Sequence, residues 1–358
     1  MAVKFTKPEI NVREKLAELD KPSGIAGEAM LRAETVEEQQ ALIGVGRRNL
    51  LINGGFDVWQ RGTSFTIGNN SVTYAPDRWA VYSNSASARS VVKVEDVIDG
   101  HTINALKWTV TSPTIDSQRE VRQLIEGLKQ FSNQTLTLSY YAKSSVNATY
   151  EVETRESYGS GGSTTVDTIR ASHNITTTWQ KFETTFNISD LTSETFGDGS
   201  YLSIMFVRRT LVTNDLYLAN IQLEFGKVAT PFEYRSYGEE LALCQRYYHT
   251  LRSGIFGVAT AVSTIAFTYS SPVTMRVTPT IGFKDSNDDI RVGDMVAQGH
   301  TINTCSIGTT TYSSVESQSW SISGTPSAPQ SGNLTPYRTY LLEPQYSNHG
   351  TFTFSSEL

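Results

Sequence analysis

Residues 49–62 read Asn-Leu-Leu-Ile-Asn-Gly-Gly-Phe-Asp-Val-Trp-Gln-Arg-Gly, an apolar run that leads directly into a Gly-Gly turn. Far downstream, residues 217–226 read Tyr-Leu-Ala-Asn-Ile-Gln-Leu-Glu-Phe-Gly, where apolar residues recur at every second position from Tyr217 to Phe225. Period-two alternation is typical of a strand with one buried face. We therefore predict that the two segments are the first and last strands of one β-sandwich.

The bulk composition limits the classes of protein to consider. A chain of 358 residues fits two or three domains, at about 100–200 residues each. Its hydrophobic content of 38% and mean hydropathy of −0.29 are typical of many short strands with polar outer faces. The net charge of −6 offers no basic footprint for phosphates, so we expect no nucleic-acid partner.

The two cysteines and the start of the chain indicate where the protein is made. Cys244 and Cys305 form neither a metal-binding pattern nor a disulfide framework, so we expect buried free thiols. The first residues lack the apolar core of a signal peptide, and no run approaches the roughly 20 apolar residues that span a bilayer. We therefore expect synthesis in the cytoplasm and no membrane insertion.

Residues 1–48 are dense in charge and predict two short helices with linker character. Asn11 with Glu14 and Thr35 with Glu38 match capping boxes that would start them. Neither helix is long enough to be stable alone, so each needs a surface to pack on. That surface is either a larger assembly or the chain's own sandwich. The apolar residues expected at this attachment surface are Val12, Leu16, Leu19, Met30, Leu31, Leu42 and Ile43.

Three further zones follow the N-terminal segment. Residues 49–235 are predicted to be one β-sandwich, and residues 236–250 a short amphipathic connector helix. Residues 251–358, rich in Ser and Thr, are predicted to form a second all-β distal domain, with a strand over Ala259–Tyr269 and a short edge piece over Thr274–Val277. The strands expected in the sandwich are Tyr74–Tyr82, Ser90–Val97, Ala105–Val110, Gln118–Leu124, Thr135–Lys143, Ala148–Glu156, Thr165–Ala171, Gln180–Asn187, Tyr201–Val207 and Asp215–Phe225.

Several of these stretches carry a resemblance to a known family. Residues 49–62, residues 217–226 and Thr-Pro-Phe-Glu-Tyr at 230–234 resemble the jelly-roll module of bacteriophage tail-fibre and virion-appendage proteins, itself similar to carbohydrate-binding modules. Residues 29–44 resemble the short helical element near the N-termini of such fibres, where these proteins attach to the virion. Glu-Glu-Leu-Ala-Leu-Cys-Gln-Arg-Tyr-Tyr at 239–248 resembles the connector before their distal domain.

The resemblance implies a function as well as a fold. It implies a mainly β chain with a helical virion-attachment segment, a jelly-roll sandwich, a connector helix and a distal β domain. Such a chain would be a homotrimeric structural subunit of a tail fibre, bound to other phage tail or virion proteins and exposed on the virion for adsorption to a bacterial surface glycan. A capsid fibre or decoration protein would carry the same modules. A glycan-degrading tailspike is a further, less favoured alternative.

No catalytic constellation stands out, so we expect no enzyme. The histidines His101, His173, His249, His300 and His349 fall in unrelated loops or element ends, and no Gly-x-Ser-x-Gly elbow occurs. Glu151 and Glu153 would share one face of a strand, which is equally typical of a solvated edge. Residues 285–289 lack the Gly and closing Glu of a calcium loop. We predict no cofactor and no metal site. A structural calcium stays open, because Asn220 stands where related carbohydrate-binding modules often carry an acidic residue.

Aromatic residues of the distal domain are the candidate ligand contacts. Aromatic rings offer a large apolar face to a sugar, and tyrosine adds a polar hydroxyl. Trp59 and Trp79 lie in strand-like contexts and are expected in the core, with Pro76–Trp79 structural in the module that the chain resembles. The candidate contact residues are Tyr312, Trp320, Tyr337, Tyr340 and Tyr346.

Overall fold

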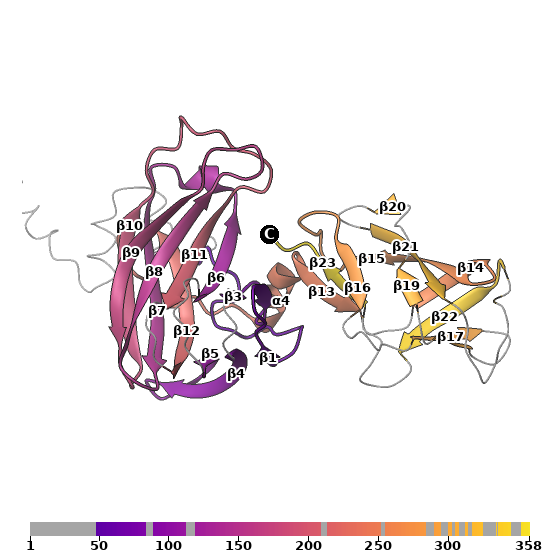
Figure 1. Ribbon diagram of the computed structural model, residues 1–358, viewed down its shortest axis with the longest axis horizontal. Coiled ribbons are helices and arrows are strands. Elements are labelled where there is room, and N and C mark those ends of the chain that lie inside the picture. Colours follow the sequence, from indigo (N-terminus) through magenta and orange to yellow (C-terminus); the bar gives the residue numbers. More distant parts are fainter. Residues whose placement is uncertain are drawn as a thin grey trace, which may run out of the picture.

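The computed structural model describes residues 48–83, 89–111, 119–208, 213–251, 255–283, 290–294, 300–302, 305–307, 312–313, 317–324, 334, 336–344 and 352–358. The predicted N-terminal helices, with the attachment residues from Val12 to Ile43, lie outside this part of the chain. The fold is mainly β, as expected, and Figure 1 shows a sandwich on the left and further sheets on the right, with one helix between them. No helix of the described residues is long and apolar enough to cross a membrane.

Two six-stranded antiparallel sheets form the sandwich (Figure 1). From β5 onward the chain passes back and forth between the two sheets, as in a jelly roll. The first sheet, in spatial order, contains β1 (Ser64–Thr66), β4 (Arg89–Ile98), β5 (His101–Val110), β12 (Asn214–Phe225), β7 (Thr135–Ser144) and β10 (Gln180–Asn187). The second contains β2 (Ser71–Tyr74), β3 (Ala80–Ser83), β6 (Arg119–Glu126), β11 (Tyr201–Arg208), β8 (Ala148–Ser157) and β9 (Val166–Ile175). A short 3-10 helix, η1 (Leu128–Phe131), precedes β7.

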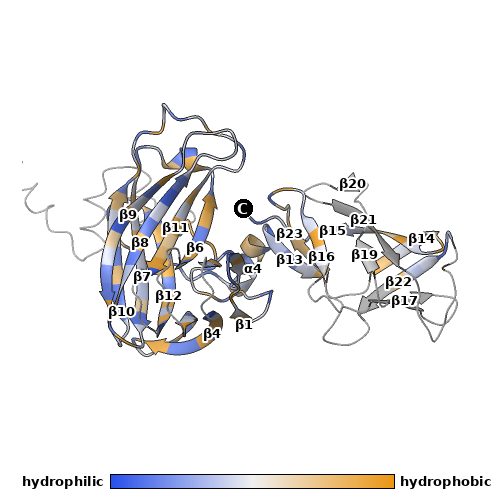
Figure 2. Cartoon of the chain, in the orientation of Figure 1, coloured by the Kyte–Doolittle hydropathy of each residue, from blue (hydrophilic) through white to orange (hydrophobic). Residues whose placement is uncertain are grey.

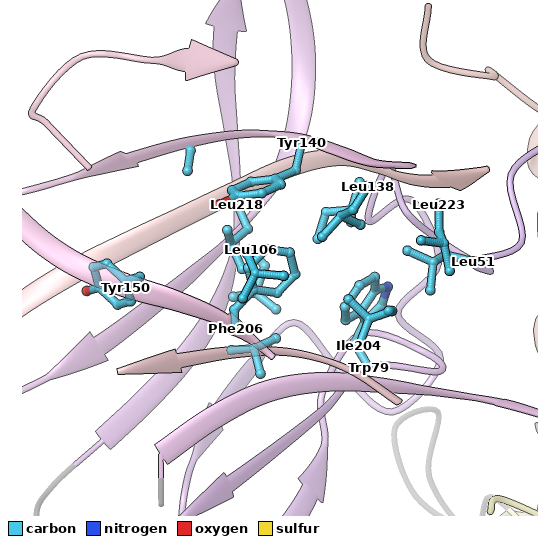
Figure 3. Close-up of a cluster of buried hydrophobic side chains, with 14 of the residues drawn as sticks. Leu51, Trp79, Leu106, Leu138, Tyr140, Tyr150, Ile204, Phe206, Leu218 and Leu223 are labelled. Atoms are coloured by element: carbon cyan, nitrogen blue, oxygen red, sulfur yellow. The ribbon is translucent and has the colours of Figure 1, made fainter. Parts of the chain in front are cut away.

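The core lies between the sheets and follows the period-two alternation of the strands, seen as successive hydrophobic and hydrophilic bands in Figure 2. Figure 3 shows Leu138 and Tyr140 of the first sheet pointing toward Phe206 of the second. The rings of Tyr140 and Phe206 meet edge to face at 4.8 Å between centroids. Trp79 is fully buried, as predicted, whereas Trp59 is only partly buried and packs against the core.

The expected first strand is wrong: residues 49–62 form no strand but a buried, turning segment. Instead of a sheet ladder, its backbone has side-chain partners together with single backbone hydrogen bonds, such as that from the Leu50 amide to the Leu223 carbonyl at 2.9 Å. The Gln123 side chain accepts from the Ile52 amide at 2.7 Å and donates to the Ile52 carbonyl at 2.7 Å. The side-chain nitrogen Nδ2 of Asn53 donates to the carbonyl oxygens of Val58 and Asp77, at 2.8 and 3.0 Å. Residues 49–62, which we call the plug, therefore pack into the sandwich through core residues such as Leu51 and Phe56.

Other element boundaries also differ from the sequence prediction. The expected strand Tyr74–Tyr82 is two strands, β2 and β3, because Pro76 opens a turn in which Arg78 takes a φ of 70°. The connector helix α4 (Tyr237–Gln245) begins at a Ser236–Glu239 capping box and ends before Tyr248, which starts a strand. Within α4, Cys244 is a buried free thiol, as expected, and burial raises its pKa.

The distal half contains two further sheets (Figure 1). The expected strand Ala259–Tyr269 is a hairpin that turns at Val262 and Ser263, two residues without the Gly or Asn that marks such turns, and Thr274–Val277 is not a strand. The three-stranded sheet contains β13 (Tyr248–Leu251), β23 (Phe352–Ser355) and β16 (Thr280–Phe283). The eight-stranded sheet contains β18 (His300–Ile302), β17 (Ile290–Asp294), β22 (Thr339–Pro344), β14 (Ile255–Ala261), β15 (Thr264–Ser270), β21 (Ser317–Gly324) and β19 (Cys305–Ile307), with β20 (Tyr312–Ser313) paired to β21.

A buried charge cluster joins the sandwich to the distal half. Glu357 pairs with Arg61 at 3.0 Å and with Arg78, which is 1% exposed. The guanidinium of Arg78 lies 3.5 Å from the ring centroid of Tyr247, and that of Arg61 lies 3.4 Å from that of Tyr248. Two arginines of the sandwich therefore hold Tyr247 and Tyr248, which follow α4, together with Glu357.

Candidate functional site

The outer face of the first sheet carries a cleft of about 190 Å³, formed by segments that are far apart in the sequence. Because side chains alternate along a strand, the residues beside core positions Leu138 and Tyr140 point to this outer face, among them Ser139 and Tyr141. The residues that line the cleft are Ile98, Asp99, His101, Ile103, Ser139, Tyr141, Lys181, Asn220, Pro231, Phe232 and Tyr234.

Small buried residues lie beneath this face and larger ones stand around them. Ala105 of β5 and Ala219 of β12 are both 0% exposed and belong to one apolar cluster with Ile98 and Ile103. Tyr141, Val94 and Trp179 pack against this cluster and are partly buried. The arrangement is an apolar floor with aromatic edges, on the side of the sheet opposite the core.

One wall of the cleft is the segment 230–234, which follows β12. The buried side chain of Gln222 fastens it: its oxygen accepts from the Glu233 amide at 2.7 Å and its nitrogen donates to the Pro231 carbonyl at 3.2 Å. The Glu233 carboxylate accepts from the Asn49 amide at 3.0 Å. Although partial burial opposes it, the hydrogen bonds from the Asn49 and Arg48 amides and the Arg235 charge hold the pKa of Glu233 below its usual value. The wall is thereby tied to the sheet.

Two aromatic side chains project from this wall. Tyr234 is 71% exposed, and its ring meets that of Phe232 edge to face at 4.9 Å. The Tyr234 hydroxyl accepts a hydrogen bond of 3.2 Å from Asn220 Nδ2. These two contacts orient the Tyr234 ring before a ligand binds.

A second aromatic group lies on the same face, next to the apolar floor that contains Ala105 and Ala219. Trp179 and Tyr217 meet edge to face at 6.3 Å, and Lys143 Nζ lies 5.1 Å and 4.8 Å from their ring centroids. Lys143 also pairs with Asp96, and Lys107 pairs with Asp215 at 2.9 Å. Although slight burial opposes it, the hydrogen bond from Lys143 holds the pKa of Asp96 below its usual value. The cations here are neutralised by neighbouring acids.

The charged groups at the cleft itself are few and of both signs. Asp99 and His101 are exposed at the turn between β4 and β5. Lys181 enters from β10, and its Nζ pairs with Glu183 at 2.7 Å. Among the described residues that line the cleft, Asp99 is the single carboxylate. Across the described chain, no group of three or more His, Cys, Asp or Glu side chains is placed to hold a metal ion.

The structure separates the aromatic residues that the sequence grouped as ligand contacts. Tyr337 is 90% exposed, but Tyr340 is 1% exposed and packs in the core of the distal sheets, so it offers no surface to a ligand. Tyr312 lies in β20 and Trp320 in β21, with side chains outside the described part, as is all of Tyr346. The sequence prediction of ligand contacts missed the cleft residues Tyr141, Asn220, Phe232 and Tyr234. The strand alternation of β7, which places Tyr141 on the outer face, was the one sequence feature that pointed to any of them.

No family model and no curated protein matches this chain. Among solved structures, a family 4 carbohydrate-binding module matches 49% of this chain and 98% of its own, at 20% identity and a TM-score of 0.32. A xylan-binding domain of family 22 from Paenibacillus barcinonensis matches 51% of this chain and 99% of its own, at 15% identity and a TM-score of 0.33. The enzymatically active domain of tailspike protein 4 from bacteriophage CBA120 matches 49% of this chain and 21% of its own, at 14% identity and a TM-score of 0.30.

Proposed function

We propose that this chain is a non-enzymatic structural subunit of a bacteriophage tail fibre, and that the cleft on the outer face of its sandwich binds a bacterial surface glycan. The observation that carries the glycan proposal is the composition of the cleft. Exposed Tyr234 and half-buried Tyr141 offer aromatic faces, while Ser139 and Asn220 offer hydrogen-bonding groups beside them. Sugars combine apolar ring faces with hydroxyl groups, so this pairing of side chains suits them.

Binding without turnover fits the charges at the cleft. Most glycoside hydrolases use two carboxyl groups that flank the scissile bond. The described lining supplies only Asp99, which lies at the mouth and is exposed. We therefore propose that the cleft binds the glycan and releases it unchanged.

The phage setting is supported by the sequence resemblance of residues 29–44, 49–62, 217–226, 230–234 and 239–248 to tail-fibre proteins. In this proposal residues 1–48 attach the subunit, as a homotrimer, to other virion proteins, and the β domains face the host. A capsid fibre or decoration protein would use the same parts. Immunogold labelling of phage particles separates tail from capsid, and removal of residues 1–48 is expected to abolish incorporation into the particle.

The glycan proposal is tested by binding of the full chain to a printed array of bacterial surface polysaccharides and neutral β-glucans. We expect wild-type protein to bind, and Tyr141→Ala and Phe232→Ala each to reduce binding about tenfold. Tyr337→Ala is the matched control, because it removes an exposed tyrosine from the distal half. Loss of binding in Tyr337→Ala alone would place the contact on the distal domain instead. A wild-type chain that binds no array glycan and no host cells would contradict the proposal.

A further inference from the structure

The strand β12 contains a bulge at the cleft. Ala219 pairs with Tyr141 and Gln222 pairs with Ser139, so that Asn220 and Ile221 together oppose the single residue Tyr140. Asn220 takes a φ of 48°, in the left-handed region that residues other than Gly adopt at a cost in free energy. A bulge re-aims a side chain, and strain of this kind is concentrated at functional sites.

Residues 49–62, at the start of the sandwich, hold the bulge in place from the core side. The Ile221 amide donates to the Gly54 carbonyl at 2.9 Å, and Asn49 Nδ2 donates to the Ile221 carbonyl at 2.9 Å. Ile221 is therefore fixed in the core at 0% exposure, while its neighbour Asn220 is directed to the outer face. The conformation of Asn220 is imposed by these buried contacts and does not depend on a ligand.

The Asn220 side chain is 7% exposed and lines the cleft. Its Nδ2 donates to the Tyr234 hydroxyl at 3.2 Å. Its Oδ1 accepts no hydrogen bond from the described residues and is not one of their fully buried unpaired atoms, so it stays open to solvent in the cleft. A carboxamide oxygen has two acceptor positions, and a ligand hydroxyl group can take the place of the water that donates to it there.

We propose that Asn220 is the specificity-determining residue of the cleft, and that its Oδ1 accepts a hydrogen bond from a hydroxyl group of a neutral pyranose stacked on Tyr234. This inference rests on the proposed glycan-binding function. The neutral class follows from the charges: Lys181 is paired with Glu183, and Asp99, the single carboxylate of the described lining, lies at the same turn as His101. Nothing at the described cleft therefore supplies an unopposed cation for an acidic sugar.

Two substitutions at one position test the acceptor role. In Asn220→Ala the acceptor is removed, and we expect affinity for the neutral array glycans that wild-type protein binds to fall about tenfold, the worth of one neutral hydrogen bond. In Asn220→Asp an acceptor oxygen remains and the Tyr234 hydroxyl can donate to the other, so affinity is expected to stay within about threefold. Polygalacturonate, an anionic probe, is expected to bind to none of the three proteins.

The controls separate failure of this inference from failure of the proposed function. Asn174→Ala removes an exposed asparagine from β9 in the other sheet and is expected to bind as wild type does. Each variant is also melted, because the expected loss in Asn220→Ala must occur in a folded protein. If Asn220→Ala binds normally while Tyr141→Ala does not, the cleft binds glycan but Asn220 does not select it. If Asn220→Asp loses as much as Asn220→Ala, or wild type binds only polygalacturonate, the acceptor and neutral-ligand assignments are overturned. A wild-type chain that binds nothing removes both proposals.

Discussion

Gly54 and Ile221 are in backbone contact so close that a Cβ atom built on Gly54 would lie 2.1 Å from the Ile221 carbonyl oxygen. The contact joins the plug at residues 49–62 to the bulge of β12, two parts of the chain that no local pattern connects. It requires glycine for space, because the φ of Gly54 is not in the left-handed region. The glycine thus allows the bulge, and through it the position of Asn220.

Gly54→Ala is expected to destabilise the sandwich by about 2–3 kcal/mol, because the neighbouring backbone must move to admit the methyl group. The measurement is chemical unfolding followed by tryptophan fluorescence. Gly238→Ala is the matched control, since Gly238 lies in α4 with no other atom within 4 Å of a built Cβ. There we expect no loss, or a gain of up to about 1 kcal/mol from helix propensity. Equal effects at the two glycines would show that the close contact is not what matters.

Glu357→Ala is expected to cost about 3 kcal/mol, because it leaves the buried guanidinium of Arg78 without its acidic partner. Scanning calorimetry of the full chain measures the shift in melting temperature. Glu183→Ala removes the acid of an exposed pair with Lys181 and is expected to change stability by less than about 0.5 kcal/mol. A Glu357→Ala protein as stable as Glu183→Ala would mean that the charge cluster does not hold the two halves together.

Asp77 is expected to make the sandwich less stable as the pH rises from about 4 to about 6. Burial raises the pKa of Asp77 to about 6 from 3.8, against the opposing effects of Arg61 and the Gln60 amide. The folded state therefore binds the proton more tightly, and stability present below the unfolded pKa is lost as the pH passes through the folded pKa. The whole effect is about 3 kcal/mol. Asp77→Asn should remove this slope from unfolding free energies measured at pH 4, 5, 6 and 7, and an unchanged slope would contradict the assignment.

His249 is expected to act in the opposite direction. It is 1% exposed and stacks on Phe354 with ring centroids 4.6 Å apart, and burial lowers its pKa to about 4 from 6.5. Stability of the distal sheets is therefore complete above about pH 6.5 and decreases as the pH falls toward 4. In His249→Gln this acid sensitivity should disappear, whereas replacing exposed His101 by Gln should leave it. Because the His249 and Asp77 windows overlap with opposite signs, the single variants are needed to separate them.

Much of the sandwich could be predicted because its strands carry their own signal. The alternation of Leu136, Leu138 and Tyr140 identifies β7, and the prediction for β10 matched its bounds. In such strands the order of apolar and polar residues shows which face is buried, because successive side chains point to opposite faces of the sheet. The short connector helix followed from apolar residues at helical spacing, and the buried thiol of Cys244 from the lack of a metal or disulfide pattern.

The site, in contrast, could not be predicted from the sequence. Tyr337 and Tyr340 stand three positions apart, yet Tyr337 is exposed in a turn whereas Tyr340 is buried, because Tyr340 lies in β22 and packs in the core of the distal sheets. The apolar run at residues 49–62 has the composition of a strand but packs as a plug, since side chains of distant residues, Gln123 among them, satisfy its backbone.

By itself, then, the sequence determined a mainly β chain with a sandwich, a connector helix and the phase of its strands, because those properties depend on neighbours along the chain. Only the tertiary structure decided that β4, β5, β7, β10, β12 and the segment 230–234 meet at one cleft. It also decided that a contact between Gly54 and Ile221 would turn Asn220 toward that cleft. These contacts join segments that are not neighbours along the chain, Gly54 and Ile221 among them, and their geometry exists only after the two sheets have packed.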